Sequence, residues 1–424
     1  MKILIVNTSE KTGGAALAAN RLMDALNRNG VKAKMLVRDK ETDKLTVVAL
    51  RKSFVQRWRF LYERWCVFCH LHFSRNHLFD LDMANTGTDI TKLPEFKEAD
   101  VVHLHWVNQG MLSLADIQKI LDARKPLVWT MHDIWPATAL CHLTLGCPRF
   151  ESRCMQCKYL PGGGSPHDLS SKIWKKKQKL YSRQNITFVA CSKWLAGEAK
   201  RSKLLKDQKV VNIPNTIDTH IFKNGNKEEA RRTESLPMDK RLVLFVAQRA
   251  TNPNKGMAYL AEACRRLEQM RPETKTDTAI VILGGHAEDL AGEFSLPVYP
   301  LGYVSDTERM VRIYNAVDAF VLPSLSENLP NTIMEALACG VPCIGFQVGG
   351  IPEMIEHRKN GYVAKFKDAA DLAEGLRWVL HEAPYATLSA NAVSKVAAAY
   401  SQQTVAMKYI EVYNHAAAYI HFRL

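Results

Sequence analysis

The sequence contains no uninterrupted apolar run that approaches the ~20 residues needed to span a bilayer. Its opening segment, Met1–Val6, is apolar enough for one strand, but it is too short and too lightly flanked for a signal peptide. Both absences predict a cytoplasmic protein. In that reducing compartment the 10 cysteines are expected to be thiols or metal ligands rather than disulfides.

Acidic residues are the minority of the charged ones, with 43 Asp and Glu against 57 Lys and Arg, so the net charge is +14. The excess is concentrated in two stretches, Arg51–Asp80 and Lys172–Lys209. The first stretch also carries the large apolar residues Phe54, Trp58, Phe60, Leu61, Tyr62, Trp65, Phe68 and Phe73. A basic, aromatic, amphipathic stretch suits an anionic membrane surface, and predicts peripheral binding at the inner face of the cytoplasmic membrane. Solvated basic helices with aromatic core faces are the alternative, and no nucleic-acid partner is expected because no module signature is present.

A chain of 424 residues exceeds what one core usually supports, so two domains are expected. Strands and helices alternate in both halves, which predicts an α/β fold with two doubly wound Rossmann-like domains facing a central cleft. The polar segment before residue 241 reads as a linker. The predicted divisions are 1–216 for the first domain, 217–240 for the linker and 241–403 for the second domain.

The most informative stretch runs from Asp318 to Gly350 and reads as strand, loop, helix and strand. Its helix directs unpaired N–H groups and a positive dipole end toward the edge of the sheet, which suits a phosphate. Glu327 in the loop and Glu335 in the helix could face one ligand, because a carboxylate accepts two hydrogen bonds from vicinal hydroxyls. A solvated loop Glu and an exposed helix Glu would be the plain alternative.

Two cations after the strand Arg241–Ala247 predict a site for a diphosphate. Arg249 follows that strand, and Lys255 opens the next helix with Gly256. A nucleoside diphosphate accumulates negative charge as it leaves, and two fixed cations with helix N–H groups can stabilise that charge without magnesium. Two unrelated surface cations would be the alternative.

In the first half, Gly13 and Gly14 follow the first strand and open a helix, which forms a general cradle for an anion or ligand. The pair lacks the G-x-G-x-x-G spacing of a dinucleotide site. His132 follows a later strand, Pro126–Met131, at an edge where open parallel sheets bind ligands. A neutral imidazole there can donate to a sugar hydroxyl. The histidines at 103 and 105 share this ambiguity, and a structural role is favoured for both.

Four cysteines crowd one irregular segment, at positions 141, 147, 154 and 157. Thiolates so close together in a reducing compartment can close a tetrahedral structural zinc site with no open position for chemistry, so Cys141, Cys147, Cys154 and Cys157 are the predicted metal ligands. Four free thiols are the alternative. Cys66-x-x-Cys69-His70 would mean covalent haem in an exported protein, but inside an aromatic helical pattern core cysteines are favoured.

The spacing Glu327-x7-Glu335, followed by Ala-x-Ala-x-Gly-x-Pro and by Gly349-Gly350-x-x-Glu353, resembles the donor-binding half of retaining glycosyltransferase family 4. The resemblance covers most of the chain and is weakest before residue 100. It extends to bacterial exopolysaccharide and O-antigen transferases that carry a cysteine-rich loop after His-Asp. Family members commonly have a glycine after the first Glu, whereas this chain has Asn328, which tolerates left-handed angles better than most residues.

The resemblance implies a GT-B fold in which the C-terminal helix, 404–424, packs back on the first domain. It places the diphosphate on Arg249 and Lys255, the ribose on Glu335 and the donor sugar on Glu327. His132 would approach from the first domain as a further catalytic residue. The remaining donor contacts implied are Asn328, Leu329, Pro330 and Asn331, and the implied contacts to acceptor or phosphate are Gly13 and Gly14.

The predicted function is retaining transfer of a hexosyl group from a nucleotide-diphosphate sugar to a saccharide acceptor. The acceptor is expected to be a lipid-linked oligosaccharide in surface polysaccharide biosynthesis, and no cofactor is expected for catalysis. A nucleotide-sugar epimerase of similar fold is one alternative, and it would consume the donor without an acceptor. A non-catalytic zinc-dependent nucleic-acid or scaffold protein is the other, and it leaves the donor-site residues without a task.

Overall fold

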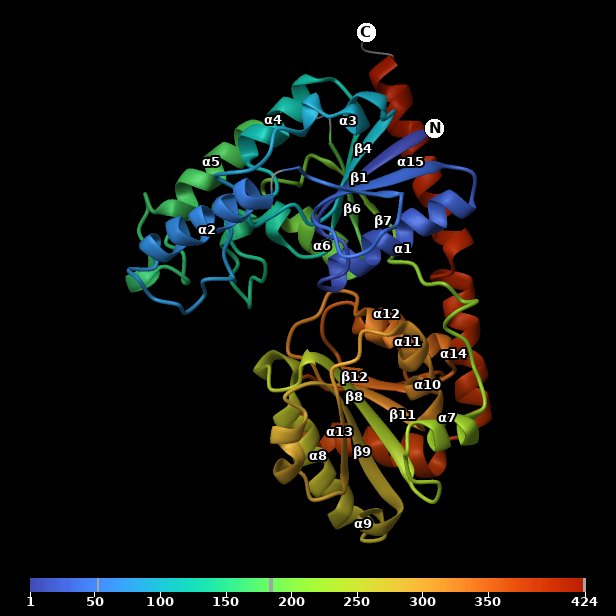
Figure 1. Ribbon diagram of the computed structural model, residues 1–424. Coiled ribbons are helices and arrows are strands. Elements are labelled where there is room, and N and C mark those ends of the chain that lie inside the picture. The colour runs from blue at the N-terminus through green and yellow to red at the C-terminus, as the bar shows by residue number, and fades with distance from the viewer. Residues whose placement is uncertain (52, 183–185, 422–424) are drawn as a thin grey trace. The chain divides into compact units, whose positions relative to one another are not determined.

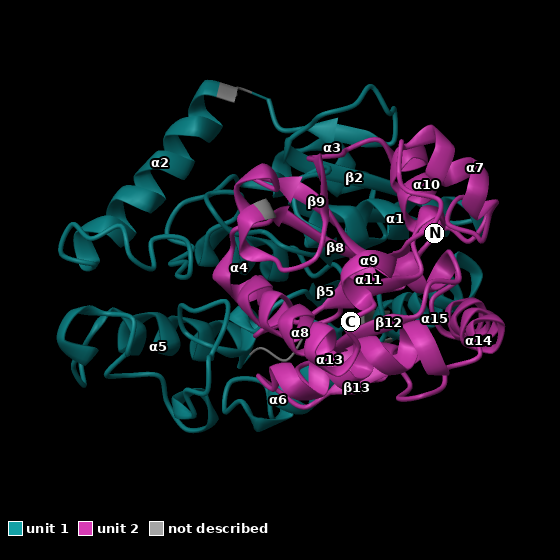
Figure 2. Cartoon of the chain, turned by 90° about the horizontal axis from the view of Figure 1, so that it is seen from below, with its two compact units in different colours: residues 1–216, 402–424 teal, residues 217–401 magenta. Residues whose placement is uncertain are grey.

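The computed structural model describes residues 1–51, 53–182 and 186–421. The chain divides into two compact units, one formed by Met1–Thr216 with Gln402–Leu424 and the other by Ile217–Ser401. Figure 1 traces the chain from end to end, and Figure 2 distinguishes unit 1 from unit 2 by colour. Each unit is built on its own parallel sheet with helices on both faces.

In the described part of the chain, unit 1 has a seven-stranded parallel sheet in the order β3-β2-β1-β4-β5-β6-β7. Its strands are β1 (Lys2–Ser9), β2 (Lys32–Asp39), β3 (Val47–Ala49), β4 (Val101–Leu104), β5 (Leu127–Met131), β6 (Ile186–Ala190) and β7 (Lys209–Asn212). These strands are apolar runs because both faces of the sheet are covered. The order reverses between β1 and β4, and at such a point the loops diverge and ligands bind.

Side chains of β1 alternate between two cores in unit 1. Ile3 and Ile5 pack with the helices on one face, α1 (Gly14–Arg28) and α15 (Gln402–His421). Leu4 and Val6 face the opposite core, because successive strand residues point to opposite faces. The helices that contribute to this second core are α2 (Ser53–His70), α3 (Pro94–Glu98), α4 (Leu114–Asp122), α5 (Leu169–Tyr181) and α6 (Lys193–Arg201).

Unit 2, whose backbone is described throughout, has a six-stranded parallel sheet in the order β10-β9-β8-β11-β12-β13. Its strands are β8 (Arg241–Arg249), β9 (Thr278–Gly285), β10 (Val298–Gly302), β11 (Ala319–Leu322), β12 (Cys343–Phe346) and β13 (Gly361–Ala364). Its helices are α7 (Lys227–Thr233), α8 (Met257–Met270), α9 (Thr274–Asp277), α10 (Thr307–Ala316), α11 (Asn331–Ala338), α12 (Ile351–Met354), α13 (Ala369–Arg377), which continues as a π turn (Trp378–Glu382), and α14 (Tyr385–Ala399).

The predicted fold class, two doubly wound Rossmann-like domains, is confirmed. The predicted linker, 217–240, differs from the structure, because these residues lie in unit 2 and include α7. Arg231 is buried there, where its guanidinium pairs with Asp318 at 2.7 Å and donates to the Ala316 carbonyl at 2.8 Å. Buried ion pairs attach the segment together with a few buried apolar residues, among them Phe222 and Leu236, so its overall polarity was misleading.

Some residues of the predicted segments lie outside the described part of the chain: Lys52 and Arg183 of the basic stretches, and 422–424 of the C-terminal helix. Among the residues that are described, no helix combines the length and the apolar character needed to cross a membrane.

Candidate functional site

The carboxyl ends of β8 and β11 lie side by side where the strand order of unit 2 reverses. Arg249 is the last residue of β8, and Lys255 lies in a 3-10 turn of the loop that follows. The loop after β11 carries Glu327 and leads into α11. The predicted donor-binding residues therefore gather at one edge of one sheet, where ligands of doubly wound folds bind.

Two glycines let the loops at this edge approach neighbouring backbone closely. Gly256 has a φ of +75°, and a Cβ there would lie 1.8 Å from the Pro323 carbonyl oxygen. Gly349 has a φ of +56°, and its Cβ would lie 1.7 Å from the Glu327 carbonyl oxygen. Only glycine fits at either position, because any side chain would collide with the backbone as well as strain it. The loops are therefore held in place by backbone packing.

Lys255 and Glu327 are in direct contact. Lys255 Nζ forms an ion pair with Glu327 Oε1, and the side chains are 31% and 13% exposed, so a ligand can reach both. The N–H of Leu325 donates to the Asn254 carbonyl at 2.8 Å, which ties the two loops together beside this pair. The expected partner of Lys255 is the diphosphate and that of Glu327 is the donor sugar. In the structure the two side chains contact each other.

Arg249 extends from the end of β8 as an exposed side chain. Its Nε donates to Thr251 Oγ1 at 3.2 Å, which orients the guanidinium within the loop. The planar fork of N–H groups suits phosphate oxygens, and its charge is permanent. The edge thus combines a fixed cation on the strand with a second cation, Lys255, on the adjoining loop.

Helix α11 begins at this same edge. Pro330 occupies its N-cap and Asn331 its first position, while Leu329 before them is 6% exposed and anchors the entry. The carbonyl of Asn328 accepts a hydrogen bond from the N–H of Gly350 at 2.8 Å, so this loop residue is tied to the loop that follows β12. The positive end of α11 adds to the attraction for an anion.

Glu335 differs from an exposed helix carboxylate. It lies in α11 with 5% of its surface exposed, and Oε2 accepts a hydrogen bond from the Tyr314 hydroxyl at 2.9 Å. A buried carboxylate requires such partners, because an unpaired charge away from water is costly. Its position is thereby fixed from α10, the helix that carries Tyr314.

The corresponding edge of unit 1 carries Gly13, Gly14 and His132. Gly13 has a φ of +93°, and a Cβ placed on it would meet no atom within 4 Å, so the space beside the loop is open. Gly14 is the first residue of α1, whose N-terminus faces the same edge of the sheet. His132 follows β5 at this edge. The loop before α1 is therefore open at the edge of the sheet where His132 also lies.

His132 is held by a second histidine. Its ring stacks on that of His105, with centroids 5.1 Å apart and an interplanar angle of 24°, and its Nε2 lies 2.8 Å from His105 Nδ1. Burial lowers the pKa of His132 to about 4 and places that of His105 well below its ordinary value. Both rings are therefore neutral near pH 7. A structural role is favoured for His105 by sequence, and the structure adds that it supports His132.

His103 lies deeper in the same group of rings. Its Nδ1 is 2.7 Å from the Tyr413 hydroxyl and its Nε2 is 2.8 Å from Thr130 Oγ1. Burial lowers its pKa to about 3. Thr130 Oγ1 also lies 2.9 Å from the Tyr409 hydroxyl, so α15 is attached to β4 and β5 by polar contacts. These contacts agree with the structural role favoured for His103.

Asp133 and His142 form a pair that the sequence interpretation did not assign. Asp133 Oδ2 accepts hydrogen bonds from His142 Nδ1 at 2.7 Å and from Trp106 Nε1 at 2.9 Å. Burial opposes ionisation of Asp133, but the charge and hydrogen bond of His142 outweigh it, and the pKa of Asp133 is lowered. The pKa of His142 is raised against its burial by the same contact. In the sequence, the only indication of a role for Asp133 was its place beside His132 at the end of a strand.

The four predicted zinc ligands lie near one another in unit 1. Burial raises the pKa of Cys141 and of Cys154 to about 12, and the neighbouring thiols of Cys147 and Cys157 act on Cys141 in the same direction. Among the residues the structure describes, no three His, Cys, Asp or Glu side chains are arranged so that they could hold a metal ion. Zinc binding at these cysteines stays a prediction.

The Cys-x-x-Cys-His segment lies at the end of α2. Cys66 and Cys69 are half-buried, and Cys66 packs against the core of unit 1, which agrees in part with the favoured interpretation. His70 is exposed, and its Nδ1 lies 2.8 Å from the Cys66 carbonyl oxygen. Other residues of α2 are the buried ones at this point.

Residues of the two halves match two family models. Residues 12–221 match the model described as Glycosyltransferase Family 4, and residues 226–395 match that described as Glycosyl transferases group 1. D-inositol 3-phosphate glycosyltransferase of Thermobispora bispora is 29% identical over 217 residues, 48% of this chain and 50% of the relative. The chain thus spans about half the length of the curated relatives it matches first.

Solved structures show the same fold at low identity. Sucrose-phosphate synthase of Thermosynechococcus elongatus superposes with a TM-score of 0.68 at 18% identity, over 98% of this chain and 99% of that one. Anabaena HepE, solved in complex with UDP-glucose, superposes with a TM-score of 0.63 at 17% identity, over 98% of this chain and 100% of that one.

Proposed function

From the premise that this chain has the GT-B fold, with a Family 4 domain followed by a group 1 domain, we propose that it is a glycosyltransferase that uses a nucleotide-sugar donor. The single observation that carries the proposal is the grouping of Arg249, Lys255 and the start of α11 at the switch point of unit 2. Such an edge binds a diphosphate by charge, and the carboxylates Glu327 and Glu335 beside it provide acceptors for sugar and ribose hydroxyls.

In this assignment each residue has one task. Arg249 and Lys255 hold the diphosphate, and they stabilise the charge that it gains as it leaves. Glu335 accepts hydrogen bonds from the ribose, and Glu327 from the donor sugar. Within the donor contacts Asn328–Asn331, the residues other than Pro330 supply backbone N–H groups, and Pro330 shapes the start of α11. Lys255 moves from Glu327 to the phosphate when the donor binds.

The proposed reaction retains the anomeric configuration and uses no covalent enzyme intermediate. The bond between the anomeric carbon and the phosphate oxygen breaks, and the acceptor oxygen bonds to the same carbon from the same face. The acceptor proton passes to the departing phosphate oxygen. His132, which is neutral near pH 7, donates a hydrogen bond to a sugar hydroxyl and requires no proton exchange with solvent.

We further propose a hexosyl donor and a lipid-linked saccharide acceptor, in surface polysaccharide biosynthesis at the inner face of the cytoplasmic membrane. The bound UDP-glucose of Anabaena HepE supports a nucleotide hexose, and the name of the Thermobispora relative adds D-inositol 3-phosphate as an acceptor to test. Gly13 and Gly14 are assigned to the acceptor or its phosphate, because an open anion cradle suits either.

The test is to incubate the purified chain with radiolabelled UDP-, GDP- and ADP-hexoses, each with no acceptor, with membrane lipid extract, and with D-inositol 3-phosphate. Label transferred only when an acceptor is present supports the proposal. Conversion of the donor sugar without an acceptor identifies an epimerase instead. Absence of sugar turnover combined with salt-sensitive nucleic-acid binding would leave the scaffold alternative.

A structural zinc ion at Cys141, Cys147, Cys154 and Cys157 remains a separate proposal. It is supported by the crowding of four cysteines in one irregular segment of the sequence, which a zinc ion would hold closed. Metal analysis of protein purified without chelator should give one zinc per chain, and Cys154→Ser/Cys157→Ser should remove it. A metal content below 0.1 per chain in wild-type protein, by the same analysis, would contradict the proposal.

A further inference from the structure

Helix α2 of unit 1 buries polar side chains and exposes apolar ones, which is the reverse of an ordinary surface helix. Its buried residues include Gln56, Glu63 and Arg64, which are 4%, 0% and 6% exposed. Trp58 and Trp65 on the other side are 57% and 56% exposed. A helix in contact with water alone normally shows the reverse arrangement, with its apolar face toward the core.

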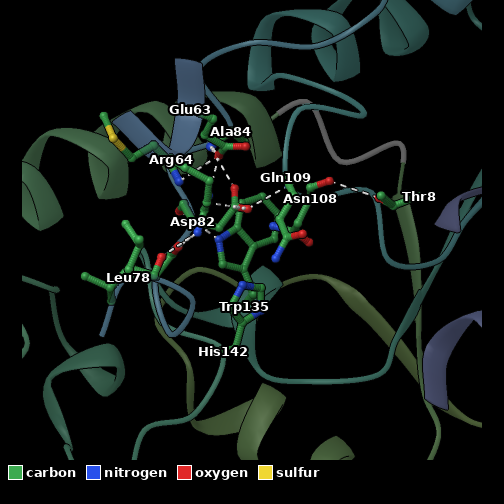
Figure 3. Close-up of polar contacts among 12 residues, drawn as sticks. Thr8, Glu63, Arg64, Leu78, Asp82, Ala84, Asn108, Gln109, Trp135 and His142 are labelled. Carbon is green, nitrogen blue, oxygen red and sulfur yellow. Dashed lines mark hydrogen bonds and ion pairs between the residues drawn. The ribbon is translucent and has the colours of Figure 1, made fainter. Parts of the chain in front are cut away.

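The inward face is fixed by a polar network around Asp82 (Figure 3). Arg64 donates to the carbonyls of Leu78 and Leu81 at 2.6 and 3.0 Å, and it pairs with Asp82 at 3.3 Å. Glu63 accepts from the N–H of Ala84 at 3.0 Å. Turning α2 over would leave these buried groups unpaired, at a large cost in free energy. The buried polar residues of the helix, Glu63 and Arg64, therefore favour this orientation.

The outward face is a continuous apolar stripe with a hollow. Its residues recur at the spacing of one helix face and are each more than 40% exposed: Phe54, Trp58, Leu61, Tyr62 and Trp65. The hollow, about 490 Å³ in volume, is lined by residues of α2 that include Trp58, Trp65 and Phe68, and by Arg75 and Leu78 of the segment after the helix. An exposed apolar patch of this kind marks an interaction site rather than a random surface.

Exposed basic side chains lie on α2 and on α5, a helix at the same end of unit 1. Arg57 on α2 and Arg75 after it are exposed, and α5 presents four exposed lysines, at 172, 175, 176 and 179. Both views place α2 and α5 at the same end of unit 1 (Figures 1 and 2). The exposed acid of the α2 segment, Asp80, is hydrogen-bonded to His77 at 2.7 Å.

We propose that α2 and α5 form a docking surface for an anionic phospholipid bilayer. The helix would lie in the plane of the interface, with its tryptophans among the acyl chains and headgroups, where aromatic rings are favoured. Arginine and lysine around it would contact lipid phosphates. The hollow beside Trp65 has the size and lining for part of a lipid chain.

The charge argues against a second copy of this chain as the occupant. Two copies joined through α2 would bring two basic rims together, and like charges across an interface oppose association. An anionic membrane complements both the apolar stripe and the rim. Membrane docking rests on the proposed lipid-linked acceptor. Membrane binding is measured without sugar transfer, so a failure of this proposal can be told apart from a failure of the transferase proposal.

The test measures binding of the full chain to sedimentable vesicles of phosphatidylcholine alone and of phosphatidylcholine with 30% phosphatidylglycerol. Wild-type protein should bind the anionic vesicles at least 10-fold more strongly, and binding should weaken between 0.05 and 0.5 M salt. Trp58→Ser/Trp65→Ser should reduce binding at least 10-fold with an unchanged melting temperature, because both side chains are exposed. Tyr303→Ser/Phe366→Ser, which removes two exposed aromatic residues of unit 2, is the matched control and should bind like wild type.

Charge is tested separately with Lys175→Gln/Lys176→Gln on α5, which should weaken binding severalfold, against Lys32→Gln/Lys34→Gln on β2, which should not. Equal binding to both kinds of vesicle, or wild-type binding by the tryptophan variant, would overturn the proposal. So would a dimer in sedimentation velocity that Trp58→Ser/Trp65→Ser converts to monomer, since a second copy would then cover the stripe.

Discussion

The carboxyl edges of the two sheets have the same strand order around the switch point and different chemistry. At the edge of unit 2, Arg249 and Lys255 are accessible cations beside the start of a helix. At the edge of unit 1, His132 and His105 are stacked rings that burial keeps neutral. Topology fixes where a ligand binds, whereas the side chains on the loops determine whether the edge attracts charge or offers neutral hydrogen bonds.

The largest effect is expected from removing a cation of unit 2. Lys255→Ala should lower kcat for sugar transfer by about 10²–10³-fold, because a fixed charge on the leaving group acts mainly in the transition state. Steady-state kinetics with the best donor measures it. Lys275→Ala, at an exposed lysine of the same unit, is the control and should leave kcat unchanged. Wild-type turnover by Lys255→Ala would refute the assigned role.

A smaller effect is expected at the buried carboxylate of the same edge. Glu335→Gln should raise the donor KM by about 10–100-fold, the range for a lost hydrogen bond to a charged group. The Tyr314 hydroxyl, which donates to Glu335 at 2.9 Å, makes Tyr314→Phe the companion variant with a milder shift in the same direction. Should Glu335→Gln change kcat while KM stays constant, the carboxylate would act on the reacting centre instead of the ribose.

The neutral edge of unit 1 should be less sensitive. His132→Gln keeps a hydrogen-bond donor and should lower kcat by about 2–10-fold, in line with one neutral hydrogen bond. Since burial lowers the pKa of His132 to about 4, the rate should show no loss attributable to this residue between pH 8 and 5. If the rate of the wild type fell below about pH 6.5 and that of His132→Gln did not, His132 would titrate in the working range, which would contradict this prediction.

Replacing Glu63, a buried carboxylate elsewhere in unit 1, should leave catalysis unchanged but alter how the stability depends on pH. Burial, with the nearby charge of Asp82, raises the pKa of Glu63 to about 9. The folded chain then holds a proton that the unfolded chain loses near pH 4.5, so this contribution to stability is complete at low pH and falls as pH rises from 4.5 toward 9. Glu63→Gln should flatten that fall in urea unfolding at pH 6 and 8.5. The exposed Glu288→Gln should keep the wild-type slope, and a Glu63→Gln slope equal to wild type would contradict the assignment.

The sequence predicts unit 2 better than unit 1 for a physical reason. Arg249, Lys255 and Glu327 follow buried strands, and the carboxyl ends of parallel strands must meet at one edge. The contact between His105 and His132 depends on pairing of β4 with β5, which no local pattern specifies. The inversion of α2 was equally hidden, because periodicity shows that a helix has two faces, whereas the partners of Arg64 determine which face is buried.

The most direct measurement of the central claim is calorimetric binding of UDP, GDP and ADP, each with its nucleoside alone, to wild type and to Arg249→Ala/Lys255→Ala. We expect one diphosphate to bind wild type, and the double variant to bind it at least 100-fold more weakly while affinity for the nucleoside is unchanged. Equal affinity of both proteins for that diphosphate, or a parallel loss for the nucleoside, would contradict a diphosphate site at the edge of unit 2.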